Sequence, residues 1–183
     1  NLLSTGNHWT EVDFQSSPTN LVIGTNGAGK STILDALTFV LFNKPFRKVN
    51  KSQLVNAVNE RECQVEIDFS INTKQYKVQR GIKPSIFNIT VDGVELHKEA
   101  DDRAMQKILE QGILKLNYKS FTQIVILGSS SFVPFMQLSS PNRREVIEDL
   151  LDIRIFSAMN NLIKDRIREK KNNIKSLDLK RDN

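Results

Sequence analysis

The feature that most constrains this chain is a glycine-rich segment behind a short apolar run. Residues 24–31 read Gly-Thr-Asn-Gly-Ala-Gly-Lys-Ser, which matches the pattern G-x-x-x-x-G-K-[ST]. The glycines let successive backbone N–H groups converge on one concavity, and a helix starting there adds its N-terminal partial positive charge. We therefore predict a phosphate-binding loop (P-loop), in which Lys30 reaches the β- and γ-phosphates of a nucleotide and the Ser31 hydroxyl ligates Mg²⁺.

Both flanks of this loop fit the prediction. Leu21, Val22 and Ile23 form an apolar run typical of a strand buried on both faces. Behind the loop, apolar residues recur at helical spacing from Ile33 to Leu41. A strand, loop and helix in this order are the context that the motif requires, although the loop does not decide between adenine and guanine.

Length and composition favour a globular protein. The chain has 183 residues, of which 39% are hydrophobic, enough for a substantial core. The single cysteine, Cys63, excludes an internal disulfide, fits a reducing compartment and alternates with apolar residues as a core-facing strand position does. No apolar run reaches the length of a membrane helix and no signal peptide is visible, so we expect a cytoplasmic protein without a membrane partner.

Periodicity predicts the elements around the P-loop. Alternation of polar and apolar residues indicates antiparallel hairpins, and a helical pattern with Gly112 near its end indicates a helix. A second apolar strand leads into the small-residue loop from Gly128 to Ser131. The predicted elements are a first hairpin at 2–14, further strands at 62–71, 75–82 and 86–91, a helix at 99–111, and the second apolar strand at 121–127.

The C-terminal part reads as one helix of about 40 residues. Ser140 is the predicted N-cap, Pro141 takes the first helical position, and no Gly or Pro follows. A narrow apolar stripe favours the beginning of a coiled coil, although Lys170 interrupts its heptads; the alternative is an amphipathic helix packed on its own domain. The stripe consists of Phe156, Met159, Ile163, Ile167, Ile174 and Leu177. We therefore divide the chain into residues 1–140 and the long helix 141–183.

Charge is unevenly distributed. Residues 164–183 hold eight Lys or Arg and four Asp or Glu, so they carry +4 of the net charge of +5. Such a region either meets phosphate backbones or is a solvated helix face with both signs interleaved. The same two interpretations, DNA contact or a solvated loop, apply to a basic cluster behind the P-loop helix, formed by Lys44, Arg47, Lys48 and Lys51.

Several parts of a working P-loop ATPase are missing from the sequence. We find no acidic residue at the end of an apolar strand to hold Mg²⁺ and no carboxylate to orient the attacking water. Asp68 lies in an alternating, half-exposed strand, and no Leu-Ser-Gly-Gly string occurs. The chain therefore looks like the N-terminal lobe of a split ATPase head with an open flank, and we expect it to hydrolyse no ATP by itself.

Three stretches together resemble the SbcC family of SMC-like recombination and repair ATPases. The resemblance spans essentially the whole chain, and residues 41–47 are most similar to the large subunits of the recombination endonucleases of T-even-like phages. The stretches are Asn1-Leu2-Leu3-Ser4 with Trp9 and Val12-Asp13-Phe14; Gly24 to Leu37; and Ser120 to Met136 followed by Arg143 to Leu151.

The resemblance implies an α/β fold, namely the N-terminal lobe of an ABC-type P-loop ATPase head with a mixed sheet that contains antiparallel hairpins and runs into a long coiled-coil helix. It further implies that the C-terminal lobe of the same protein supplies the missing groups, and that two heads form a homodimer around ATP and Mg²⁺. ATP-driven dimerisation then controls access of a partner metallonuclease of the SbcD type to double-stranded DNA.

The same resemblance implies the site residues. Lys30 is the expected catalytic cation, Ser31 the expected Mg²⁺ ligand, and Ser4 approaches the base; the expected nucleotide contacts are Asn26, Gly27, Ala28, Gly29, Lys30, Ser31, Thr32 and Ser4. The family usually has a Gln in the loop after the second apolar strand, where it touches Mg²⁺ and the attacking water. Ser129 takes that place here, so we expect Ser129 as a catalytic and metal-binding residue whose hydroxyl cannot position water as an amide does.

Two alternatives share this fold. An SMC-type chromosome-organising ATPase would have nearly the same sequence and no nuclease partner, and a RecF-like repair ATPase would lack the long coil. A module that binds nucleotide without hydrolysing it is a further alternative, because the chain shows no catalytic base.

Overall fold

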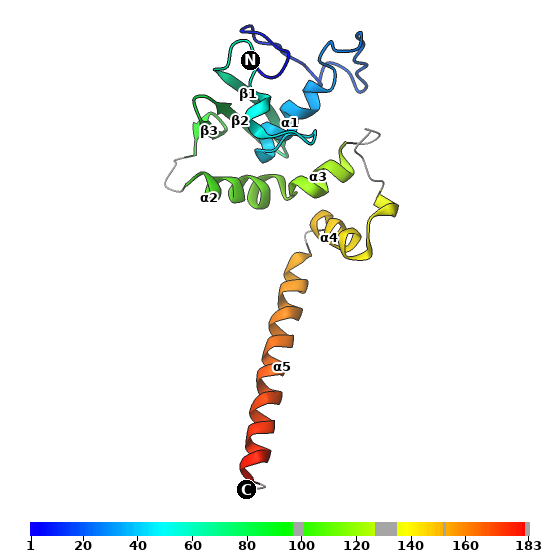
Figure 1. Cartoon of the computed structure of the whole chain (residues 1–183), viewed down its shortest axis with the longest axis vertical. Coiled ribbons are helices and arrows are strands. Elements are labelled where there is room, and N and C mark those ends of the chain that lie inside the picture. Colours follow the sequence, from blue (N-terminus) through cyan, green and yellow to red (C-terminus); the bar gives the residue numbers. More distant parts are fainter. Residues whose placement is uncertain (97–100, 127–134, 152, 182–183) are drawn as a thin grey trace. The chain divides into compact units, whose positions relative to one another are not determined.

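The computed structural model describes residues 1–96, 101–126, 135–151 and 153–181. The chain forms two compact units, Asn1–Val133 and Pro134–Asn183. The first contains the P-loop and the sheet, and the described part of the second is helical (Figure 1). None of the helices in the described residues is both long and apolar enough to cross a membrane.

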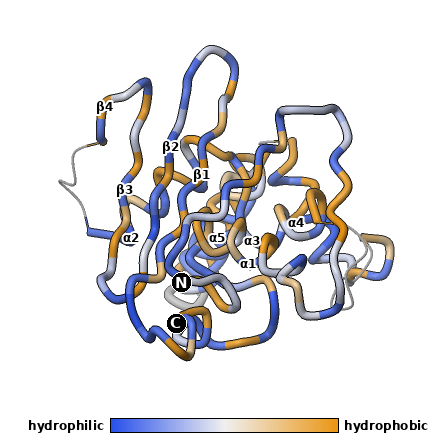
Figure 2. Tube along the Cα trace, turned by 90° about the horizontal axis from the view of Figure 1, so that it is seen from above, coloured by the Kyte–Doolittle hydropathy of each residue, from blue (hydrophilic) through white to orange (hydrophobic). Residues whose placement is uncertain are grey.

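Among the described residues of the first unit, the sheet has four antiparallel strands in the order β1-β2-β3-β4. They are β1 (Cys63–Ile71), β2 (Lys74–Ile82), β3 (Ile86–Val91) and β4 (Val94–Glu95). Asn72 and Asp92 turn the chain with φ angles of 55° and 49°, as tight hairpin turns require. The three predicted strands at 62–71, 75–82 and 86–91 are confirmed, and their interleaved hydrophilic and hydrophobic residues can be followed in Figure 2.

One helix, α1 (Thr32–Phe42), carries the P-loop onto the sheet, as the apolar spacing behind the loop predicts. Its buried residues pack against β1 and β2, and Asn43 ends it in the left-handed conformation with φ 57°. A short 3₁₀ helix, η1 (Lys51–Leu54), follows. The prediction that Cys63 faces the core is confirmed, since its side chain is completely buried beside Phe39 and Leu54.

Arg80 joins α1 to the sheet and to the next helix. Its Nε donates to the carbonyl oxygen of Val40 at 3.0 Å, its Nη2 donates to Gln106 Oε1 at 2.7 Å, and the guanidinium lies 3.6 Å from the centre of the Phe87 ring. Burial lowers the pKa of Arg80 to about 10, and nearby Asp102 and Glu110 oppose this change. This buried cation satisfies a carbonyl near the C-terminal end of α1, which has no partner within the helix.

Below α1 and the sheet in Figure 1, three helical segments follow one another. They are α2 (Asp102–Lys107), the π-helix η2 (Ile108–Leu114) and α3 (Tyr118–Ile124). The helix predicted at 99–111 is confirmed from residue 102 onward, but the helical turns pass through Gly112 and end at Lys115, which has φ 53°. Met105, Leu109 and Phe121 contribute to the same core as α1.

The predicted strand at 121–127 is wrong over the described residues, because this segment forms most of α3. Asn117 caps the helix by accepting the N–H of Ser120 at 2.8 Å, and Phe121 packs on Phe42 with ring centres 5.0 Å apart. A short apolar run fits a buried helix as well as a strand, and here local capping decides. The loop from Gly128 to Ser131 lies outside the described residues.

The expected hairpin at 2–14 and the strand at 21–23 are also wrong. Leu2 makes a single antiparallel bridge with Val55, and the remainder of 2–14 forms no strand. Leu21 and Ile23 are 82% and 83% exposed. A central strand is stable only between neighbouring strands, and the described residues provide none here. The sheet of the described residues is therefore antiparallel rather than mixed, and the apolar run at 21–23 lies on an open flank.

The described part of the second unit forms two α-helices where the sequence predicts one. They are α4 (Ser140–Leu150) and α5 (Arg154–Arg181), preceded by a short 3₁₀ turn, η3 (Phe135–Gln137). The N-cap of α4 is Ser139 rather than Ser140, and Pro141 lies in its first turn. The N–H of Ile153 bonds to the carbonyl oxygen of Glu148 at 3.0 Å, one residue farther back than in an α-helix, and this wider turn closes α4. The apolar stripe of α5, from Phe156 to Leu177, is at least half exposed at each of its six positions.

Candidate functional site

The P-loop enters α1 through two glycines in the left-handed region. Gly27 has φ 87° and Gly29 has φ 91°, which L-residues rarely adopt. The N–H of Thr32 bonds to the Gly29 carbonyl oxygen at 2.9 Å, so the helix begins within the loop. Ser31, the N-cap residue, makes no side-chain capping bond. Its hydroxyl is therefore not committed to the helix that it starts.

Lys30 lies across its own loop. Its Nζ donates to the carbonyl oxygens of Gly24 at 2.7 Å and Thr25 at 2.8 Å. An ammonium group has three N–H donors, so these two bonds leave one for a further acceptor. The arrangement places a cation at the mouth of the loop, where it complements the partial positive charge of the α1 N-terminus in attracting anions.

Hydrogen bonds to residues 54–56 hold the N-terminal segment in place. The N–H of Leu3 bonds to the Leu54 carbonyl oxygen at 2.7 Å, and Asn56 Nδ2 donates to the Leu3 carbonyl oxygen at 2.7 Å. Ser4 consequently lies against Gly29, where a Cβ atom would come within 3.3 Å of the Ser4 Oγ. Only glycine fits there without strain, because the conformation and the close neighbour both disfavour a side chain.

These segments enclose a cleft of about 500 Å³, a volume typical of small-molecule sites. Three stretches contribute to it: the N-terminal segment, the P-loop with the start of α1, and residues 47–57. The lining residues are Leu3, Ser4, Asn26, Gly27, Gly29, Lys30, Ser31, Thr32, Arg47, Gln53, Val55 and Ala57. The sequence-predicted site residues are thus brought together, with two exceptions.

The exceptions are Ala28 and Ser129. Ala28 is exposed outside the lining, and its N–H bonds to the Thr25 carbonyl oxygen at 3.2 Å. Ser129 lies outside the described residues. The segment before that loop contains one glutamine, Gln123, which lies on α3. Its buried Oε1 has no hydrogen-bond partner among the described residues.

Arg47 and Gln53 line the cleft without having been assigned to it from the sequence. Arg47 reaches it because the buried carboxylate of Asp35, on α1, accepts the Arg47 Nε at 2.6 Å. Gln53 Oε1 accepts the N–H of Asn50 at 2.7 Å, so its amide nitrogen remains a donor. The sequence signal that could have identified Arg47 was Asp35, a carboxylate among the apolar positions of the predicted helix. A buried charge requires a partner of opposite charge or hydrogen-bond donors.

The other members of the basic cluster have separate contacts. Lys44 lies 5.4 Å from the Tyr118 ring centre, and Lys51 lies 5.8 Å from that of Phe39. Burial lowers the pKa of Lys51, with a further contribution from Arg80, and Asp102 opposes the change. Lys48 is exposed. These cations therefore do not form one continuous site.

The same cleft contains a candidate oxygen ligand for Mg²⁺, the hydroxyl of Ser31. The described residues contain no group of three or more His, Cys, Asp or Glu side chains that could hold a metal by themselves. The uncommitted Ser31 hydroxyl fits an ion that keeps most of its waters and shares phosphate oxygens, which is how Mg²⁺ is bound in nucleotide sites.

This chain is similar to a known protein family and to several known proteins. A family model described as AAA domain matches residues 1–182. Exonuclease subunit 2 of Escherichia phage RB69 is 42% identical over 182 residues, which are 100% of this chain and 32% of that protein. Exonuclease subunit 2 of Enterobacteria phage T4 is 42% identical over 164 residues, 90% of this chain and 29% of that protein.

A more distant relative is the SbcC component of the SbcCD nuclease of Staphylococcus aureus, 26% identical over 185 residues, which cover 91% of this chain and 18% of that protein. The chain spans about a third of the length of the phage relatives that it matches. The resemblance to SbcC-type proteins and to the phage large subunits is thereby confirmed. Since the family model covers nearly every residue, the chain belongs to the AAA domain family.

Proposed function

We propose that this chain is the ATP-binding N-terminal lobe of an SMC-like ATPase in DNA double-strand-break repair and recombination, acting with a nuclease subunit. The observation that carries the proposal is the cleft in which the P-loop, Lys30 and the Ser31 hydroxyl converge. The names of the relatives, exonuclease subunit 2 and the SbcC component of a nuclease, support the nuclease connection.

In the proposed mechanism this chain binds and orients the triphosphate. The P-loop backbone N–H groups and the third N–H of Lys30 face the phosphate oxygens, and Ser4 with Leu3 borders the base and ribose side of the cleft. Ser31, and Ser129 in our assignment, would hold Mg²⁺, which would supply charge neutralisation at the phosphates when bound. Lys30 stabilises negative charge that develops there, which is how such sites accelerate phosphoryl transfer.

The groups that orient the attacking water are proposed to come from the C-terminal lobe of the same protein. The exposed run Leu21–Ile23 and the 68% exposed Trp9 support this, because such apolar residues are normally covered by a partner. Residues 1–140 would then form the lobe, and 141–183 would begin an antiparallel coiled coil through the exposed stripe of α5. Two heads would close as a homodimer around two ATP molecules and regulate the access of an SbcD-type metallonuclease to double-stranded DNA.

The proposal is tested by coexpressing the complete protein with a candidate SbcD-type nuclease from the same genome. We expect the two proteins to copurify and to degrade linear duplex DNA with ATP consumption that Lys30→Ala abolishes, while the 183-residue chain alone hydrolyses no ATP. If no nuclease copurifies and the ATPase is still stimulated by DNA, the chromosome-organising alternative replaces this function.

A further inference from the structure

Asn56 connects the N-terminal segment to the turn that follows η1. Its Nδ2 donates to the carbonyl oxygens of Leu3 at 2.7 Å and Thr5 at 3.1 Å. Its Oδ1 accepts the backbone N–H groups of Val58 at 2.9 Å and Asn59 at 3.1 Å. A side-chain amide has two N–H donors and one oxygen with two lone pairs. The hydrogen-bonding capacity of the Asn56 side chain is therefore fully used, and its two ends hold two different segments of the chain.

The segment that Asn56 holds contains a residue in an unfavourable backbone conformation. Leu3 has a φ of 51°, in the left-handed region that residues with a Cβ rarely adopt. Such a conformation persists only where the surrounding structure imposes it, and it is often found where a ligand is held. Asn56 binds the Leu3 carbonyl oxygen, and the Thr5 hydroxyl both donates to the carbonyl oxygen and accepts the N–H of Leu2, each at 2.8 Å. These bonds together keep the turn at residues 2–5 in its strained shape.

Asn56 does not line the cleft itself, but residues next to its contacts do. In the N-terminal segment these are Leu3 and Ser4, and Ser4 is the residue between the two whose carbonyl groups Asn56 binds. In the other segment they are Val55 and Ala57, its direct neighbours in the sequence. We call Leu3 and Ser4 the nucleoside wall, because in the proposed binding mode they border the base and ribose while the P-loop faces the phosphates.

We propose that Asn56 is a positioning residue for nucleotide binding, which fixes the nucleoside wall before the nucleotide arrives. The inference rests on the proposed ATP binding and deepens it, because it separates the residues that hold the wall from those that bind phosphate. Without the two bonds from Asn56, Leu3 relaxes from the left-handed conformation, and the nucleotide has to restore the wall when it binds. That ordering cost lowers the affinity for a ligand that contacts the wall and leaves phosphate binding by the P-loop unchanged.

The test uses two calorimetric titrations of the complete protein with Mg²⁺, one with ATP and one with inorganic tripolyphosphate. Asn56→Asp keeps an acceptor for the N–H groups of residues 58 and 59 but removes both donors to the N-terminal segment. Asn59→Asp is the matched control, because it adds the same charge to the same turn. Asn59 itself bonds the N-terminal segment only through the side chains of Asn1 and Asn7.

Affinities are compared with those of Asn59→Asp, so that repulsion between the added carboxylate and the anionic ligands affects both proteins. Relative to this control, we expect Asn56→Asp to weaken ATP affinity about 5- to 50-fold, the range for loss of two ordinary hydrogen bonds, and to change tripolyphosphate affinity by less than about twofold. A merely structural role of Asn56 would weaken both ligands equally. That result would overturn the positioning role.

Thr5→Val provides a second test, which also serves if Asn56→Asp fails to fold. It adds no charge and removes the hydroxyl that closes the turn on Leu2, so we expect the same selective loss of ATP affinity. Unchanged ATP affinity in Thr5→Val and Asn56→Asp, with a large loss in Lys30→Ala, would overturn this inference and leave the proposed function intact. No ATP binding by the unaltered protein would overturn both.

Amide hydrogen exchange of the protein without nucleotide measures the wall directly. The N–H groups of Leu3 and Thr5 are hydrogen-bonded to the carbonyl oxygens of Leu54 and Leu2. We expect both to exchange faster in Asn56→Asp than in Asn59→Asp, while the amides of α1 exchange at the same rate in the two variants. Equal exchange at Leu3 and Thr5 in the two variants would show that Asn56 does not hold the wall, and would overturn the inference.

Discussion

Gly29 and Gly27 allow the geometry of the P-loop to be tested with a matched pair of substitutions. Both have φ near +90°, where a non-glycine residue costs about 1–3 kcal/mol. If that strain opposes the binding conformation, alanine at either position weakens ATP affinity by roughly 5- to 150-fold. At Gly27 this is the whole effect, because no atom lies within 4 Å of an added Cβ.

Gly29→Ala carries an additional cost. Its Cβ would lie 3.3 Å from the Ser4 Oγ, tighter than an ordinary contact. We expect Gly29→Ala to weaken ATP binding more than Gly27→Ala does when Ser4 is present, and the two losses to become equal in a Ser4→Gly background, each measured against Ser4→Gly alone. Calorimetric titrations of the wild type and these five variants would measure the affinities. Equal losses at the two glycines when Ser4 is present, or unequal losses in the Ser4→Gly background, would refute the packing of the N-terminal segment on the loop.

Two further predictions concern the core. Ile89→Ala should lower the free energy of unfolding by about 2–5 kcal/mol in urea denaturation, because this side chain is completely buried, whereas Val58→Ala, at an 89% exposed position, should change it by less than about 0.5 kcal/mol. Burial raises the pKa of the Cys63 thiol above its usual range, so the thiol ionises first in the unfolded chain as the pH rises. The native state therefore loses stability above the ordinary thiol pKa of about 8.5 but not at neutral pH. The free energies of unfolding of the wild type and of Cys63→Ala should be compared from about pH 7 to 10. We expect the wild type to become less stable relative to Cys63→Ala only in the alkaline part of this range. A difference that is constant with pH would contradict the buried thiol.

Local signals predicted the parts of the fold that depend on local interactions. The alternation around Val65 and Val78 predicted the hairpins, since each strand finds its partner across a two-residue turn. The apolar spacing after Lys30 predicted α1. The glycines at 27 and 29 predicted the P-loop conformation, because few other residues adopt its backbone angles.

Features that depend on distant partners were missed. The run at Leu21–Ile23 has strand composition, but a strand also needs neighbours that the described residues do not supply. The segment from Tyr118 to Ile124 was ambiguous between strand and helix, and its contact with Phe42 could not be read from periodicity. The break between α4 and α5 carries no Gly or Pro. The place of Arg47 at the cleft depends on a carboxylate twelve residues away, and only the fold shows that this carboxylate is buried.

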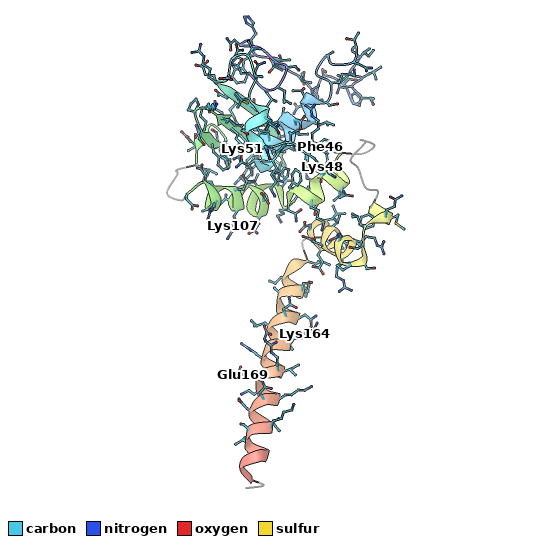
Figure 3. All side chains as sticks on the ribbon, in the orientation of Figure 1. Phe46, Lys48, Lys51, Lys107, Lys164 and Glu169 are labelled. Carbon is cyan, nitrogen blue, oxygen red and sulfur yellow. The ribbon has the colours of Figure 1, made fainter. Side chains whose placement is uncertain are left out.

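The central claim is that the residues between Gly24 and Ser31 bind the phosphates of ATP. The most direct measurement is the equilibrium affinity of the complete protein for ATP with Mg²⁺, compared with Lys30→Ala and with Lys164→Ala, an exposed lysine on α5 (Figure 3). The account predicts that Lys164→Ala binds as the wild type does and that Lys30→Ala binds at least about tenfold more weakly. Equal affinities for all three proteins would contradict it.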